Sequence, residues 1–209
     1  MSAHRLYQVG GGAVVVGGLV VIAGTLGRLP FAWDDFNNPG YVTTTLLQIT
    51  GSILVLMGLP AIAVFVAGRS VWLGIATYVG LWIPTVVLNV AANFLNVAIG
   101  PYLLTHGGVP KELPGVFMPI LLASIATWVV AGVLIGVGII RTKVFPIWVV
   151  GLMLLSVACE FIPVDAVKNG LSPSLAFAAV ASMGWLVTSR NRADRNADRG
   201  DAAQVGVRA

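Results

Sequence analysis

The sequence predicts an all-α polytopic membrane protein, with six transmembrane helices in one bundle and both termini in the cytoplasm. Hydrophobic residues make up 57% of the 209-residue chain, and charged residues only 10%. Six apolar stretches are long enough to cross a hydrocarbon layer roughly 30 Å thick, which takes about 20 helical residues. Since lipid offers no water to an open sheet edge, we expect each stretch to be a helix.

The predicted spans account for nearly all of the chain up to Ser189. In order, they cover residues 7–26, 43–67, 71–98, 116–140, 145–164 and 171–187. No Ala-x-Ala cleavage site follows the first span, and its length suits a retained helix better than the core of a signal peptide. Pro84 falls inside the third span and should kink it.

The segments between the spans differ in length and composition. Turns 68–70 and 141–143 are short and basic, so the helices that they join should be antiparallel neighbours. Connections 28–42 and 100–115 are longer and rich in Pro, Gly and Asn. After Ser189 the apolar pattern stops, so we divide the chain into a transmembrane domain, 1–189, and a disordered basic tail, 190–209.

Arginine and lysine predict the orientation, because they accumulate on the cytoplasmic side of a membrane. Nine basic residues fall at the end of the bundle that holds both termini, and three fall at the other end: Arg28, Lys111 and Lys168. We therefore place the termini in the cytoplasm. The net charge of +4 then faces anionic membrane lipids, which argues against nucleic acid as a partner.

Several kinds of chemistry are disfavoured by composition. Cys159 is the only cysteine and lies within a span, so we expect neither a disulfide nor a thiol-based metal site. His4 and His106 are the only histidines and lie outside the spans, which argues against haem and histidine-metal sites. All three lysines lie in connections, where a membrane-embedded Schiff base could not form. No metal and no cofactor is expected.

Polar residues in three spans follow helical spacing. In the third span, steps of 4, 3, 4, 4 and 3 residues separate Tyr78, Trp82, Thr85, Asn89, Asn93 and Asn96. In the second span, Thr44, Gln48 and Ser52 are four residues apart, as are Ser156 and Glu160 in the fifth. Residues at such spacing share one helical face. Lipid excludes such faces, so we expect them to point into the bundle.

These faces should meet in the outer half of the membrane. Glu160 lies 15 residues after Phe145, which at 1.5 Å per residue places it roughly 22 Å from the cytoplasmic side. Trp82 and Trp128 lie deep enough in their spans to line a cavity. The sequence therefore predicts a polar, aromatic-walled cavity with Glu160 as its ionisable group. Asp34 and Asp35, in the loop above, are further candidate catalytic residues.

Each candidate has a purely structural alternative. Asparagine and glutamine in a bundle often do no more than bond across helices, for about 0.6 kcal/mol each. Glu160 could reach the outer interface or pair with Lys168. Asp34 and Asp35 could be a solvated loop pair that caps the next helix.

Two short sequences carry a resemblance to known proteins. Residues 34–39 read Asp-Asp-Phe-Asn-Asn-Pro, and residues 142–148 read Thr-Lys-Val-Phe-Pro-Ile-Trp. With the six-helix plan, they resemble a large family of bacterial integral membrane proteins of unknown function, which implies a bacterial inner (plasma) membrane location. In general plan, the chain is also similar to the small integral membrane terpene cyclases of meroterpenoid pathways. The resemblance implies no particular catalytic residues.

The second resemblance gives the most specific hypothesis. Acid-initiated cyclisation of a prenyl chain needs a protonated acid, an apolar cavity and aromatic faces that stabilise carbocations. Glu160 would be the proton donor, Asn89 and Asn93 its orienting partners, and Trp82 and Trp128 the cation-stabilising walls. The alternatives are a small-molecule transporter, exporter or self-protection protein that works as a homo-oligomer, or an accessory subunit without a ligand.

Overall fold

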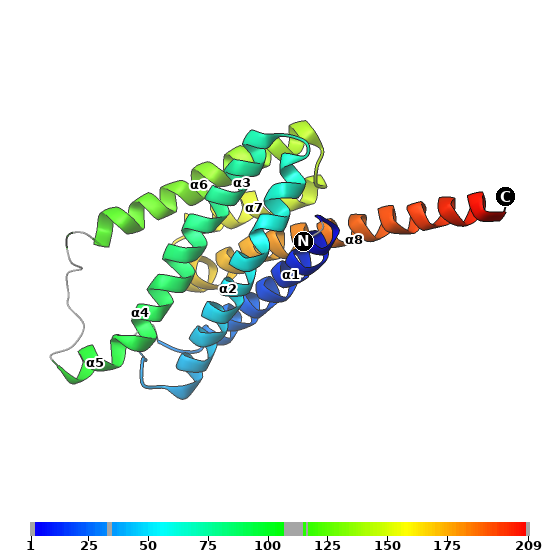
Figure 1. The fold of residues 1–209 in the computed structure, drawn as a ribbon. Coiled ribbons are helices and arrows are strands. Elements are labelled where there is room, and N and C mark those ends of the chain that lie inside the picture. Colours follow the sequence, from blue (N-terminus) through cyan, green and yellow to red (C-terminus); the bar gives the residue numbers. More distant parts are fainter. Residues whose placement is uncertain (1–2, 33–34, 107–114, 116, 208–209) are drawn as a thin grey trace.

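The computed structural model describes residues 3–32, 35–106, 115 and 117–207, with side chains described from His4 to Arg192 outside residues 33–34, 107–114, 116 and 117. The described chain is all α-helical, as predicted, and contains two π-helical segments, η1 and η2 (Figure 1). Its elements are α1 (Ala3–Arg28), α2 (Pro39–Ala67), α3 (Val71–Pro84), η1 (Thr85–Ala91), α4 (Ala92–Ala98), α5 (Gly100–Thr105), α6 (Phe117–Thr142), α7 (Ile147–Glu160), η2 (Val167–Leu171) and α8 (Ser172–Val207).

The protein is a multi-pass membrane protein by helix length and hydropathy. Five helices are long and apolar enough to cross a membrane: His4–Arg28, Pro39–Ala67, Val71–Thr105, Met118–Thr142 and Val167–Arg192. The third of these joins α3, η1, α4 and α5 end to end, and the fifth joins η2 to the first part of α8. Together with α7 they give six helical rods, which confirms the predicted number of helices.

The fifth predicted span is shorter than the sequence indicated. We expected a helix over 145–164, but α7 covers the 14 residues Ile147–Glu160, or about 21 Å at 1.5 Å per residue. Pro146 has extended backbone angles and lies just before the helix. Pro163 follows its end and disfavours helical geometry at Ile162. Two prolines therefore limit the length of α7 within an otherwise continuous apolar stretch.

The rods form a closed ring in the order α1, α2, α3, α6, α7, α8. Glycine lets α1 approach both of its neighbours closely. A Cβ atom at Gly17 would lie 2.6 Å from the main-chain oxygen of Gly51 in α2, and one at Gly11 would lie 2.8 Å from that of Gly184 in α8. Contacts of this kind hold membrane helices together by close packing.

Both ends of the ring can be recognised from contacts. At one end the start of α1 meets α8, where Asn191 Nδ2 donates to the main-chain oxygen of His4 at 3.2 Å. Phe65 and Phe145 pack at the same end, and Arg190 donates to the main-chain oxygen of Val144 at 2.6 Å. The start of α1 and residues 190–191 of α8 therefore lie at the same end of the ring. The connections 29–38, described except for residues 33–34, and 161–166 lie at the opposite end.

Helix α8 continues beyond the rest of the bundle to Val207 (Figure 1). The sequence predicted a tail without regular structure over 190–209. The described backbone of this stretch is instead helical up to Val207. A helix that is already nucleated extends at little cost, and the extension is rich in alanine and arginine, which are good helix formers.

Candidate functional site

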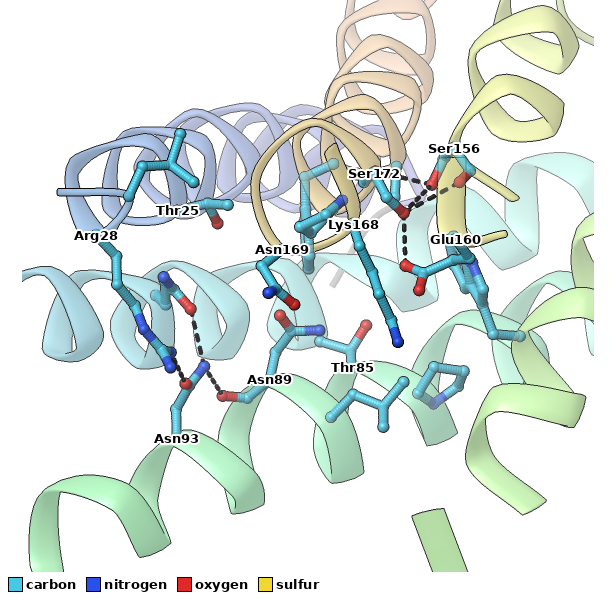
Figure 2. A pocket seen from close by; sticks show the side chains of 18 of the residues that line it. Thr25, Arg28, Thr85, Asn89, Asn93, Ser156, Glu160, Lys168, Asn169 and Ser172 are labelled. Atoms are coloured by element: carbon cyan, nitrogen blue, oxygen red, sulfur yellow. Dashed lines mark hydrogen bonds between the residues drawn. The ribbon is translucent and has the colours of Figure 1, made fainter. Parts of the chain in front are cut away.

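A cavity of about 820 Å³ lies inside the ring, toward the end that holds connections 29–38 and 161–166 (Figure 2). All six rods contribute to its wall. The part deeper in the bundle is apolar and is lined by Val55, Leu81, Leu88, Trp128, Ala176, Phe177 and Val180. The part near the connections carries most of the polar residues, namely Thr25, Arg28, Gln48, Asn89, Asn93, Asp165, Lys168 and Asn169, together with the apolar Leu29, Phe31, Ala32 and Ala166.

Asn93 is at the centre of a hydrogen-bond network on the polar side. Its Nδ2 donates to Gln48 Oε1 at 3.0 Å and to the main-chain oxygen of Asn89 at 2.8 Å. Its Oδ1 accepts from Arg28 Nη1 at 2.8 Å. The two amide hydrogens both face acceptors, so the orientation of the amide is fixed, with its oxygen toward Arg28. The network joins α1, α2 and α4 across the cavity wall.

Glu160 lies on the opposite side of the cavity, beside two serines of α7 and α8 (Figure 2). Ser172 Oγ is 2.6 Å from Glu160 Oε1 and 3.0 Å from the main-chain oxygen of Ser156. Ser156 Oγ in turn donates to the main-chain oxygen of Ser172 at 2.8 Å. Glu160 therefore does not pair with Lys168, and Asn89 and Asn93, which we expected to orient it, form no hydrogen bond with it.

Ser172 links α8 to both Ser156 and Glu160 of α7. A serine hydroxyl has one hydrogen, and a main-chain carbonyl can only accept. Ser172 Oγ donates to Glu160 Oε1, and its 3.0 Å contact with the main-chain oxygen of Ser156 shares the same hydrogen. Ser172 therefore holds the Glu160 carboxyl in place on the cavity wall.

Two amides point into the cavity without a partner. Figure 2 shows the side chains of Asn89, on η1, and Asn169, on η2, directed into the open space. Within the described part of the chain, neither side chain forms a hydrogen bond. Unpaired amides on the wall of an internal cavity are available to a ligand.

Both π-helical segments lie on the cavity wall, and one of them changes the predicted polar face. A π-helix has more residues per turn than an α-helix, so it rotates the residues before it relative to those after it. The inward positions are Thr77, Leu81, Thr85, Asn89 and Asn93, which follow in steps of four. Pro84, which we expected to kink the span, is the residue just before η1.

The rotation separates residues that we expected on one face. Tyr78 and Trp82 are exposed on α3, Trp82 at 41%, and neither lines the cavity. Asn96 is half-buried and also lies off the cavity wall. The expected aromatic wall therefore lacks Trp82 and consists of Trp128, Phe31 and Phe177.

The remaining predicted residues divide in a similar way. Gln48, Thr85, Asn89, Asn93, Trp128, Ser156 and Glu160 all line the one cavity. Asp35 does not, because its Oδ2 accepts from Asn38 Nδ2 at 3.0 Å, and Asn38 caps α2 by accepting from Gly40. Asp34 lies outside the described residues.

Six polar or charged lining residues were not among the predicted site residues: Thr25, Arg28, Asp165, Lys168, Asn169 and Ser172. They lie near the ends of the predicted spans or between them, where no helical face was predicted. A signal was present, because Asp165, Asn169, Ser172 and Ala176 recur at helical steps of 4, 3 and 4, which extends the last span toward its start.

The described residues contain no group of three His, Cys, Asp or Glu side chains that could hold a metal ion. The fold defines a multi-pass helical membrane protein, and the ring of helices encloses a cavity. Comparisons with protein families, with curated proteins and with solved structures gave no match for this chain.

Proposed function

We propose that the protein binds a lipophilic or amphiphilic small molecule in its internal cavity. The volume of about 820 Å³ is within the range of small-molecule sites, roughly 300–1,000 Å³. The apolar deep part suits a hydrocarbon chain, and the polar part near the connections suits a head group. A molecule of this kind enters the membrane readily.

The finer proposal is that Glu160 protonates a prenyl chain in this cavity and so starts its cyclisation. The proton leaves the Glu160 carboxyl, the π electrons of a terminal alkene form the new C–H bond, and the resulting cation is attacked by the next alkene. The cyclised cation then loses a proton to the Glu160 carboxylate, which returns Glu160 to its starting form. Faces of Trp128 and Phe177 would stabilise the intermediate cations.

The observation that supports this chemistry is the position of Glu160, whose carboxyl group lines the same cavity as Trp128 and Phe177. Ser172 Oγ donates to Glu160 Oε1 at 2.6 Å, so the carboxylate that remains after proton transfer keeps a hydrogen-bond donor. A charge-assisted hydrogen bond of this kind stabilises the ionised product.

Turnover of a farnesylated phenol by the purified protein tests the proposal, with the products separated by mass. We expect cyclised product from the natural protein and a rate lower by at least about 100-fold in Glu160→Gln, since general acids contribute that much or more. Asp165→Asn is the matched control, because Asp165 is an exposed carboxylate on the same wall. Equal rates for Glu160→Gln and the natural protein would exclude acid catalysis by Glu160.

Binding without chemistry is the second candidate function. It is favoured by Arg28 and Lys168, two cations on the wall that a neutral prenyl chain does not require. In that case the protein is a transporter, an exporter or a self-protection protein, and it works as a homo-oligomer. Cross-linking in native membranes distinguishes this candidate, since it predicts a dimer or larger assembly.

A further inference from the structure

Two basic residues on the cavity wall have no acidic partner among the described residues. They are Arg28, at the end of α1, and Lys168, in η2. We infer that the ligand is an amphiphile whose head group is a phosphate ester, bound between Arg28 and Lys168. This inference rests on the proposed binding function and specifies the chemical class of its ligand.

The guanidinium of Arg28 is held by neutral groups. Its Nη1 donates to Asn93 Oδ1 at 2.8 Å, and its Cζ lies 4.8 Å from the centroid of the Tyr41 ring. Within the part of the chain that the structure describes, no carboxylate comes within ion-pair distance of it. A half-buried arginine in a membrane protein is costly unless an anion neutralises it, so a ligand is expected to supply the charge.

The direction of Arg28 argues against an ordinary contact with bilayer head groups. Asn93, its partner, is only 5% exposed and is fixed by its bonds to Gln48 and to Asn89. Arg28 therefore points into the cavity, and Asn93 acts as a positioning residue. One hydrogen bond uses one of the five guanidinium hydrogens, so a pair of parallel donors remains for a phosphate.

Lys168 borders the same opening. Figure 2 shows its side chain directed into the cavity, where it has no hydrogen bond or ion pair with any described residue. Its helical segment lies against the chain just after Arg28, since a Cβ atom at Gly170 would lie 2.7 Å from Leu29 Cδ2. The two cations thus come from elements that touch at the mouth of the cavity.

The acidic residues on the wall do not neutralise these cations. Glu160 is turned toward Ser172, and Asp165, like Lys168, is exposed; neither carboxylate forms an ion pair with Arg28 or with Lys168. Arginine binds phosphate through two parallel hydrogen bonds, and lysine adds a point charge. With the head group at this end, the chain of the ligand would extend toward Leu81, Trp128 and Val180.

Four probes test the inference with the protein in nanodiscs of phosphatidylcholine. They are farnesyl phosphate, farnesol, phosphatidic acid and inorganic phosphate, and binding of radiolabelled farnesyl phosphate is measured directly and by competition. We expect farnesyl phosphate to bind more tightly than farnesol. Arg28→Gln and Lys168→Gln should each weaken the binding of farnesyl phosphate by about 10-fold or more, and leave the binding of farnesol unchanged.

Two further variants keep the result interpretable. Arg69→Gln removes an exposed charge in the turn at the opposite end and should bind like the natural protein. Arg28→Lys keeps the charge but loses the paired donors, so it should recover only part of the affinity that Arg28→Gln loses. Unchanged farnesol binding shows that the cavity of each variant is intact.

The outcomes separate the two levels of the proposal. Equal binding of farnesyl phosphate and farnesol, unaffected by Arg28→Gln and Lys168→Gln, would overturn the phosphate site and leave the binding function standing. Binding of none of the probes would overturn both. Competition by phosphatidic acid would identify a bilayer phospholipid as the source of the head group, and competition by inorganic phosphate alone would identify a free anion.

Discussion

Asn93 is the residue on which the polar side of the cavity depends. It is 5% exposed and joins Arg28, Gln48 and the backbone at Asn89. The sequence predicted its inward position but could not predict its partners. Arg28 lies 65 residues away, and the sequence treats it as a charge outside the first span.

Replacing Asn93 with leucine tests how much this network stabilises the fold. The change leaves Arg28 and Gln48 without their partner, and an unsatisfied buried polar group costs about 1–3 kcal/mol. We expect a loss of about 2–3 kcal/mol in the free energy of unfolding, measured by thermal denaturation in detergent. Asn96→Leu is the control and should stay close to the natural protein, since no side-chain hydrogen bond holds Asn96 within the described part of the chain. Equal effects of the two variants would contradict this role.

Lys143 has a backbone conformation that residues with a Cβ atom rarely adopt. Its φ is 54°, in the left-handed region, and its N–H donates to the main-chain oxygen of Ile139 at 2.8 Å, just after the end of α6. Glycine is usual at such a position because it has no Cβ atom.

A glycine at this position should therefore stabilise the protein. We expect Lys143→Gly to raise the free energy of unfolding by about 0.5–1 kcal/mol. Left-handed geometry costs a residue with a Cβ atom about 1–2 kcal/mol, and glycine avoids this cost. Part of the benefit is lost because glycine is more flexible in the unfolded chain. Lys143→Ala removes the same charge and keeps the strain, so it should not stabilise. Thermal denaturation of both variants gives the answer, and a gain in Lys143→Ala would show that charge is responsible.

At the scale of the helix, the π segments explain where sequence reasoning succeeded and failed. Hydropathy alone predicted the number of rods, although α7, with 14 residues, is shorter than the apolar stretch that predicted it. Periodicity of 3.6 residues, however, selected Tyr78 and Trp82, whereas the inward positions Leu81, Thr85 and Asn89 follow in steps of four. A local change from α- to π-helix has no clear sequence pattern of its own, although Pro84 marks the place where it begins.

Close packing of α1 gives a prediction for the helix pair. Ala at position 17 would place its Cβ 2.6 Å from the main-chain oxygen of Gly51, so α1 and α2 would have to separate. We expect Gly17→Ala to lower the free energy of unfolding by about 1–3 kcal/mol, as overpacking does elsewhere. Gly12→Ala is the matched control, because a Cβ atom there would meet nothing within 4 Å.

The stability of the control variant, Gly12→Ala, should not fall. Alanine in a helix is better than glycine by roughly 0.5–1 kcal/mol, so Gly12→Ala is expected to be neutral or slightly stabilising. Thermal denaturation in detergent, followed by the loss of helical circular dichroism, measures both variants. If Gly17→Ala were as stable as Gly12→Ala, the close contact between α1 and α2 would not exist.

At the scale of the whole molecule, the ring order is what the sequence could not provide. Short turns predict that α2 neighbours α3 and that α6 neighbours α7, and both pairs are in contact. Closure of the ring depends on α1 packing against α8, through small residues such as Gly11 and Gly184. Many small residues occur in this chain, so their presence does not say which pairs meet. The cavity follows from that closure.

The orientation of the ring in its membrane is the last prediction. The sequence predicts nine basic residues on the side of the termini and three on the other side, so we expect the cavity to open away from the cytoplasm. Single cysteines at Asn37 and at Arg69, both exposed and at opposite ends, test this in a Cys159→Ala background. A maleimide that cannot cross membranes should label position 37 in intact cells, and position 69 only after permeabilisation.

The opposite labelling pattern would change the source of the ligand. The mouth between Arg28 and Lys168 would then face the cytoplasm, where the anionic lipids of the inner leaflet and soluble phosphate esters both have access to it. With the predicted orientation, a ligand must instead come from the outer leaflet or from within the bilayer. The labelling experiment therefore decides which pool of molecules should supply the phosphate probes, independently of whether Glu160 carries out chemistry on them.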